Sequence, residues 1–121
     1  MAGKSRILVV DDDPEITAML SRSLSRQGFE IDATSSTEDA LTRCASVPYA
    51  AAILDLVMPG RDGADLADAL REKIPGLPVV LLTGYSQSPL IEAARRRPAT
   101  AVFTKPVSIG DLADFLKAEI R

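Results

Sequence analysis

The chain has 121 residues, 46% of them apolar and 26% charged, which suits one soluble domain with its own hydrophobic core. Its formal net charge of −3 argues against a domain that binds nucleic acid through a basic face. A single cysteine excludes an internal disulfide, the absence of histidine excludes the usual zinc sites, and no apolar run is long enough to span a membrane. We therefore expect one cytoplasmic domain over residues 1–121, with its core over about residues 5–121 and no output domain in this chain.

Five apolar runs predict strands that are buried in a sheet. They cover residues 6–10, 29–33, 51–55, 78–82 and 100–103. Between and after them, apolar residues recur at helical spacing, in residues 14–27, 36–47, 64–74, 86–97 and 109–121. Asp13 before Pro14 is a typical helix start, and Gly28 is a typical helix stop. The chain is therefore expected to alternate strictly between strands and helices.

This alternation predicts a doubly wound α/β fold, in which a parallel sheet lies between two layers of helices. The carboxyl ends of the strands then meet at one edge of the sheet. Polar residues stand at these ends: Asp11 and Asp12 after the first strand, Asp55 at the third, Thr83 after the fourth and Lys105 after the fifth. Residues that lie far apart in the sequence should therefore gather in one pocket.

The chemistry of these side chains predicts a phosphoryl-transfer site. Carboxylates that converge repel each other, by roughly 4 kcal/mol for two unit charges 4 Å apart at an effective dielectric of 20. Either protonation or a cation must remove this repulsion, and oxygen ligands of this kind suit the hard cations Mg²⁺ or Mn²⁺. The ammonium of Lys105 and the hydroxyl of Thr83 could hold the oxygens of a phosphoryl group. Asp55 would then be the nucleophile.

Four pieces of the sequence, in this order and at this spacing, form a specific set. They are residues 9–12 (VVDD), 53–63 (ILDLVMPGRDG), 82–84 (LTG) and 104–106 (TKP). The set resembles the receiver domain of bacterial two-component response regulators, in particular the single-domain chemotaxis regulators, and the resemblance covers residues 5–121. It implies a flavodoxin-like (βα)5 fold with three α/β/α layers and strand order 2-1-3-4-5.

The resemblance also implies the role of each acid. Asp55 would accept a phosphoryl group from a phosphohistidine on a histidine kinase or a histidine phosphotransfer protein. Asp12 would bind Mg²⁺ directly and Asp11 through a water, while Asp55 and the backbone carbonyl of Val57 would supply further oxygens. The chain would act as a signalling switch rather than as an enzyme on an external substrate, with self-phosphorylation and self-dephosphorylation as its only chemistry.

The remaining family positions concern the response to phosphorylation. Thr83 would bind one phosphoryl oxygen and Lys105 another, and the peptide bond between Lys105 and Pro106 would be cis. The face made by the fourth helix, the fifth strand and the fifth helix would then repack and change its affinity for a downstream partner, which the sequence does not specify. We expect no nucleic acid and no membrane to be bound by this chain, and a monomer as the default.

Two departures from the family pattern stand out. Val102 occupies the position where the family often has a tyrosine or phenylalanine that swings inward when the threonine moves to the phosphoryl group. The aromatic residue here is Phe103, one position later, and it should point to the opposite face of the strand. At the rim of the pocket, Val57 and Tyr85 are apolar and aromatic. These two side chains are expected to exclude water, so that the phosphoryl group is lost more slowly than in members with polar residues there.

Two other functions fit parts of the pattern. A phosphohydrolase of the haloacid dehalogenase type also uses a strand-end aspartate, Mg²⁺, a hydroxyl and a lysine. Such an enzyme needs a second aspartate two residues after the nucleophile, where this chain has Val57, and usually a cap domain. A degenerate receiver would serve only as a protein-binding module, and the presence of Asp55, Thr83 and Lys105 argues against it.

Overall fold

The computed structural model describes residues 4–58, 61–84 and 89–120. Within these ranges the long strands are β1 (Arg6–Val10), β2 (Glu30–Thr34), β3 (Ala51–Asp55), β6 (Val79–Thr83) and β7 (Thr100–Thr104). The helices are α1 (Pro14–Ser25), α2 (Thr37–Cys44), α3 (Gly63–Lys73), α4 (Pro89–Arg95) and α5 (Ile109–Glu119). Two short strands in the described part, β4 (Val57–Met58) and β5 (Arg61–Asp62), lie between β3 and α3.

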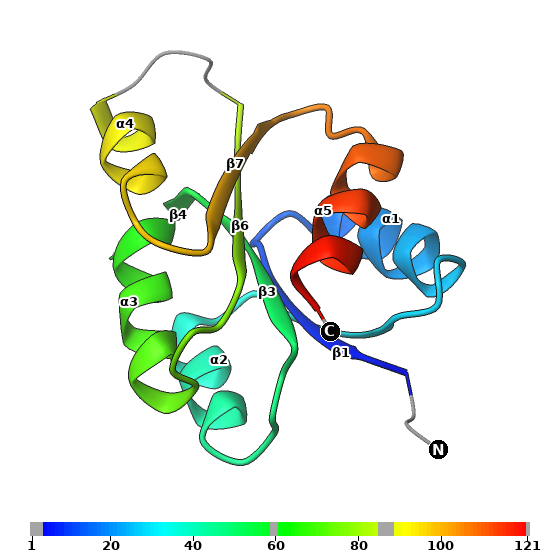
Figure 1. The fold of residues 1–121 in the computed structure, drawn as a ribbon, viewed down its shortest axis with the longest axis horizontal. Helices are drawn as coiled ribbons and strands as arrows, with labels where there is room; N and C mark the ends of the chain where they lie inside the picture. Colours follow the sequence, from blue (N-terminus) through cyan, green and yellow to red (C-terminus); the bar gives the residue numbers. More distant parts are fainter. Residues whose placement is uncertain (1–3, 59–60, 85–88, 121) are drawn as a thin grey trace.

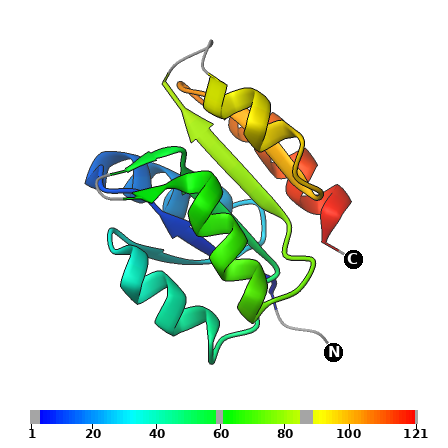
Figure 2. The same cartoon turned by 90° about the vertical axis from the view of Figure 1, so that its left-hand side faces the viewer.

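The long strands form one parallel sheet in the order β2-β1-β3-β6-β7 among the described residues. Because β4 and β5 are counted in the labels, this is the predicted order 2-1-3-4-5. Figure 1 shows α1 and α5 on one side of the sheet and α2, α3 and α4 on the other. Figure 2 faces the second side, with α2 and α3 on the side of the sheet toward the viewer. The predicted three-layer, doubly wound fold is confirmed.

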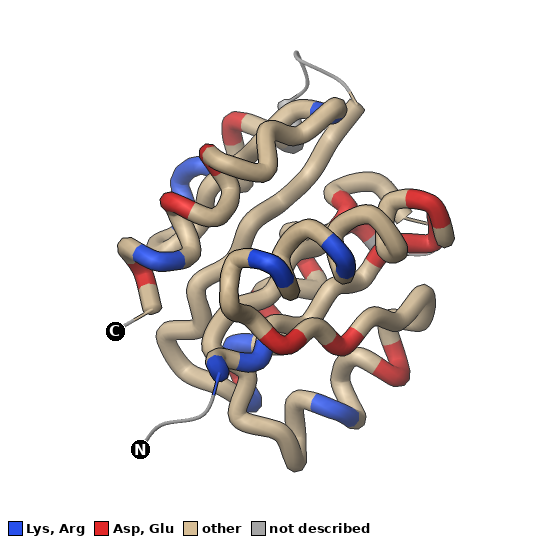
Figure 3. The backbone as a smooth tube through the Cα atoms, turned by 90° about the vertical axis from the view of Figure 1, so that its right-hand side faces the viewer, with Lys and Arg blue, Asp and Glu red and all other residues tan. Residues whose placement is uncertain are grey.

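The core has two halves because successive residues of a strand point to opposite faces of the sheet. Leu8, Leu54 and Leu81 pack toward α2, α3 and α4, whereas their neighbours on the strands pack toward α1 and α5. Both halves consist mainly of aliphatic side chains. Among the described residues, no helix is both long enough and apolar enough to cross a membrane. Acidic and basic residues lie interspersed along the backbone in Figure 3.

The predicted helix starts are largely correct. Asp13 caps α1 by accepting the Glu15 N–H at 2.9 Å, with Pro14 as the first helical residue, and Ser36 caps α2. Several ends differ by a few residues. Helix α1 ends at Ser25, before Gly28 with its φ of 96°; α2 ends at Cys44, before residue 47; and α4 begins at Pro89, while residues 85–88 lie outside the described part.

The short antiparallel pair of β4 and β5 was not predicted. Val57 pairs with Asp62, and Met58 with Arg61. The loop that follows Asp55 therefore has a fixed register and leads directly into α3. Asp62 caps that helix by accepting the Asp65 N–H at 2.8 Å. This arrangement holds the residues after Asp55 beside the end of β3.

Candidate functional site

The structure brings the predicted acids together at the carboxyl edge of the sheet. Asp11 and Asp12 follow β1, and Asp55 ends β3, the strand that pairs with β1. Each of the three offers a carboxylate oxygen, and these oxygens lie within 4.8 Å of one another. Lys105, which follows β7, reaches the same place. The convergence expected from a parallel sheet is therefore present in the folded chain.

Asp55 is nearly buried, with 9% of its surface exposed. Its Oδ1 accepts the Val57 N–H at 3.2 Å, and its Oδ2 lies 3.5 Å from Lys105 Nζ. The pKa of Asp55 is raised, chiefly because burial disfavours the charged form and also because Asp11 lies nearby. Lys105 and the Val57 N–H oppose this shift. The carboxylate is thus held in place but only partly neutralised.

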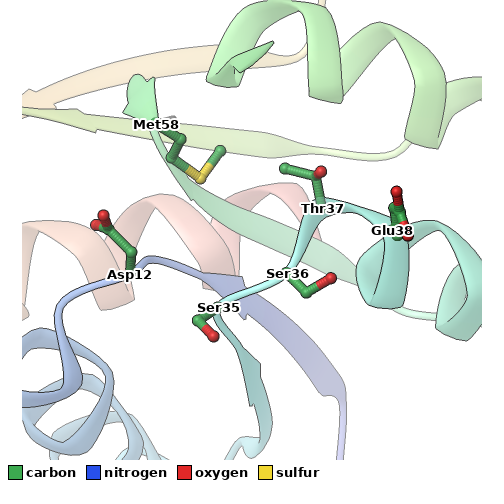
Figure 4. Close-up of a pocket in the computed structure, with 6 residues that line it drawn as sticks. All are labelled: Asp12, Ser35, Ser36, Thr37, Glu38 and Met58. Carbon is green, nitrogen blue, oxygen red and sulfur yellow. The ribbon is translucent and has the colours of Figure 1, made fainter. Parts of the chain in front are cut away.

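The two acids after β1 differ in exposure. Asp11 is 2% exposed, and its Oδ1 accepts the Asp13 N–H at 2.9 Å while its Oδ2 faces Lys105 Nζ at 3.4 Å. Asp12 is exposed and lines a hollow of about 250 Å³ together with residues 35–38 and Met58. Figure 4 shows the Asp12 carboxylate across this hollow from Ser35 and Ser36. Asp12 is therefore open to solvent, whereas Asp11 is fixed inside.

Lys105 and Thr83 come from neighbouring strands, β7 and β6. The Lys105 N–H donates to the Thr83 carbonyl at 2.7 Å, and the bond between Lys105 and Pro106 is cis, as the resemblance implied. The Thr83 side chain is buried, with 1% exposure. Gly84, which belongs to the motif over residues 82–84 but was given no role from the sequence, lines the hollow of about 400 Å³ beside Asp55, Val57 and Lys105. Its place directly after a strand end was the available signal.

The donor set fits a hard divalent cation. Carboxylate oxygens come from Asp11, Asp12 and Asp55. The Gly63 N–H donates to the Leu56 carbonyl at 2.7 Å, which makes the pair of Val57 with Asp62 a non-hydrogen-bonded pair of the β4–β5 ladder. The ladder therefore leaves the Val57 carbonyl for another partner. An all-oxygen set of this kind suits Mg²⁺ or Mn²⁺.

The expected departures at the switch and rim positions are partly visible. Val102 packs toward α2, α3 and α4, and Phe103 packs on the opposite face, where its ring centroid lies 6.3 Å from that of Phe115. The opposite orientation of these two side chains is confirmed. Val57 exposes 50% of its surface at the rim. Tyr85, the other rim residue, lies outside the described residues.

Residues 7–117 match the family of the response regulator receiver domain. Among curated proteins, the transcriptional regulatory protein TcrA of Mycobacterium tuberculosis is 33% identical over 113 residues, which cover 93% of this chain and 45% of that protein. The photosynthetic apparatus regulatory protein RegA of Rhodobacter capsulatus is 33% identical over 115 residues, which cover 93% of this chain and 61% of that protein. The chain thus spans about half the length of the curated relatives it matches.

Solved structures show the same likeness. The crystal structure of a response regulator receiver domain protein from Clostridium thermocellum superposes with a TM-score of 0.85 at 28% identity, covering 96% of this chain and 94% of that one. One from Methanospirillum hungatei has a TM-score of 0.88 at 25% identity, covering 98% of this chain and 94% of that one. The family match and the similar solved structures agree with the strand order described above. The chain belongs to the response regulator receiver domain family.

Proposed function

We propose that this chain, as a single receiver domain over residues 1–121, is a phosphoacceptor switch of a two-component phosphorelay. Asp55 accepts the phosphoryl group from a phosphohistidine on a histidine kinase or a histidine phosphotransfer protein. The observation that carries the proposal is the meeting of Asp55 with Asp11, Asp12 and Lys105 at one edge of the sheet. Membership in the receiver family supports the same role.

The proposed transfer is a substitution at phosphorus. A carboxylate oxygen of Asp55 attacks the phosphorus atom, the bond from phosphorus to the imidazole nitrogen breaks, and the electron pair stays on the imidazole, which takes up a proton. The phosphoryl group adds about −1.5 to −2 charges to the pocket at neutral pH. Lys105 Nζ lies 3.5 Å from Asp55 Oδ2, so its ammonium would pair with the added negative charge. Its contact with Asp11 Oδ2 would loosen at the same time.

The donor set described above suggests which residues would hold the cofactor. Asp11, Asp12, Asp55 and the carbonyl of Val57 would bind Mg²⁺ or Mn²⁺, with Asp12 as a direct ligand and Asp11 acting through a water. The bound cation would supply charge neutralisation for the transferred phosphoryl group. The exposure of Asp12 gives the cation a route from solvent.

The response to phosphorylation is proposed to be a population shift. Thr83 and Lys105 would engage the phosphoryl oxygens, and the face made by α4, β7 and α5 would repack. Because Val102 stands at the usual aromatic position and Phe103 packs against Phe115 on the other face, this repacking would proceed without the aromatic movement common in the family. Half-exposed Val57 would shield the phosphoryl group from water and prolong its lifetime.

An experiment with a phosphoryl mimic tests the function. Mg²⁺ and beryllofluoride are added to the protein while its amide resonances are followed. We expect shifts around Asp55, Thr83 and α5, and their complete loss in Asp55→Ala. The matched control is Asp13→Asn, which removes a neighbouring charge but keeps a good helix cap, and it should respond like the unchanged protein.

The other outcomes of this experiment point to the alternatives. No response in the unchanged protein would contradict the proposal and favour a degenerate receiver that only binds proteins. A parallel assay with Mg²⁺ and a phosphate ester tests the second alternative, and turnover of the ester would favour a haloacid-dehalogenase-type hydrolase. The absence of an acid at Val57, two residues after Asp55, argues against that activity.

A further inference from the structure

Gly63, the first residue of α3, lies directly against the peptide between Asp55 and Leu56. A Cβ at this position would overlap the carbonyl oxygen of Asp55 and would lie 2.9 Å from Leu56 Cα and 3.0 Å from the Asp55 carbonyl carbon. Gly28 and Gly76 differ, since their φ angles are positive and a Cβ there would meet nothing within 4 Å. Glycine is therefore required at position 63 because a side chain has no room there, and not because the backbone needs a positive φ.

Neither side of this contact can move away easily. Leu56 is fully buried, and its N–H donates to the Leu82 carbonyl at 2.8 Å, which ties the peptide to β6. On the other side, Leu66 and Leu70 of α3 are also fully buried, so the helix is packed onto the core. The Gly63 N–H donates to the Leu56 carbonyl at 2.7 Å and joins the two sides. An added side chain would have to displace backbone, because no flexible side chain stands in the way.

We propose that Gly63 is a positioning residue for the phosphoacceptor site, an inference that rests on the proposed function. The peptide that a side chain at position 63 would displace carries Asp55 itself and leads to Val57. Displacing it would break the contact from the Val57 N–H to Asp55 Oδ1, now 3.2 Å, and would turn the Val57 carbonyl. The glycine thus holds two of the proposed cation ligands in register through the backbone alone.

The test compares Gly63→Ala with the unchanged protein. The Mg²⁺ dissociation constant and the beryllofluoride response are measured by amide resonances. A displacement of about 1 Å in a positioned group is enough for large losses, so we expect Gly63→Ala to weaken Mg²⁺ binding about tenfold, and Gly63→Val to weaken it further. The matched control is Gly110→Ala in α5, where the Cβ would meet only Ser108 Oγ, at 4.0 Å, and Mg²⁺ binding should be unchanged.

A second variant separates positioning from stability. Leu70→Ala leaves a cavity at a distant point of the same helix, so it should lower stability and keep the Mg²⁺ affinity. All titrations are run in sucrose, which favours the folded state, so that each variant is measured as a folded protein. A folded Gly63→Ala that binds Mg²⁺ and beryllofluoride like the unchanged protein overturns the inference. Failure of the unchanged protein to bind either one overturns the proposed function instead.

Discussion

Two regions of this molecule handle charge in opposite ways. Where α3 and α4 meet the start of β7, two arginines make short contacts: Arg97 donates to both oxygens of Asp68 at 3.0 Å, and Arg71 donates to the carbonyls of Leu77 and Ala99 at 3.0 Å. We call this region the arginine corner. At the site edge, Asp11 and Asp55 share Lys105 at 3.4 and 3.5 Å. Paired contacts hold the corner together, whereas the two carboxylates at the site edge share one ammonium and stay incompletely paired.

The pKa values of two aspartates show the same contrast. The pKa of Asp68 is lowered, chiefly by its hydrogen bond from Arg97. The pKa of Asp55 is raised, chiefly by burial and then by Asp11, although Lys105 is near. An ionised aspartate therefore stabilises the fold at position 68 and lowers its stability at position 55. Functional sites often carry such a cost, because their charges are arranged for a ligand and not for the folded protein alone.

The largest expected effect comes from removing Arg71. Its guanidinium also donates to Thr100 Oγ1 at 3.0 Å, so one side chain links α3 to the starts of β6 and β7. We expect Arg71→Ala to lower the free energy of unfolding by about 2 kcal/mol, because backbone carbonyls lose a charged donor. Chemical denaturation measures the free energy of unfolding. The control is Lys73→Ala, an exposed position on the same helix, whose free energy of unfolding should stay within about 0.5 kcal/mol of the unchanged protein. Equal effects of the two variants would show that the corner does not hold the fold.

A smaller effect of opposite sign is expected at the site edge. Asp55→Asn should raise the free energy of unfolding by roughly 1 kcal/mol at pH 7 without Mg²⁺, since it removes a buried charge that is incompletely paired. The folded pKa of Asp55 is raised, so the unchanged protein loses stability as pH rises through that pKa, and the gain from asparagine should vanish below about pH 3.9.

Denaturation at several pH values, with Asp13→Asn as the control, checks the Asp55→Asn prediction. Excess Mg²⁺ should stabilise the unchanged protein and reverse the order of the two. If Asp55→Asn were less stable than the unchanged protein at pH 7 without Mg²⁺, the site edge would not carry the cost described here.

The smallest expected effect concerns the pair of Asp68 with Arg97. The Asp68 side chain is 55% exposed, so Asp68→Asn should lower the free energy of unfolding by less than about 1 kcal/mol at pH 7. Because the folded pKa of Asp68 is lowered, its contribution is present above the unfolded pKa of about 3.9 and is lost as pH falls through the folded value. A double-mutant cycle with Arg97→Gln isolates the pair. A coupling energy that persists in acid would contradict this account.

The sequence predicted the fold and the site acids for the same reason. Apolar runs that end in Asp11 and Asp55 define both the strands and the edge where they meet, so a local pattern carries long-range information. No local pattern of the sequence predicted the arginine corner. Residues 95–97 look like a solvated basic helix end, which suits exposed Arg95, but Arg97 turns back onto Asp68 of α3. Its partner lies 29 residues away, and only tertiary packing brings the two together.

The loop after Asp55 was missed for a related reason. In the sequence, β4 and β5 are separated by two residues, Pro59 and Gly60, and such a short connection is typical of a hairpin. Each strand has just two residues, however, so no alternation of apolar and polar residues could indicate it. In the sequence, Gly63 stands out only as the last residue of the motif over residues 53–63. Its close approach to Asp55 depends on how α3 packs on β3, and no local pattern reports that distance.

The space around Gly63 also limits how chains of this kind can diverge. Every other amino acid adds at least a Cβ, so no gradual series of substitutions leads away from glycine at this position. Half-exposed Val57 stands at the rim of the same site and can be replaced by residues of many sizes and polarities. Under the proposed function, evolution or design could adjust the lifetime of the phosphoryl group at the rim, while the backbone beneath Asp55 stays fixed.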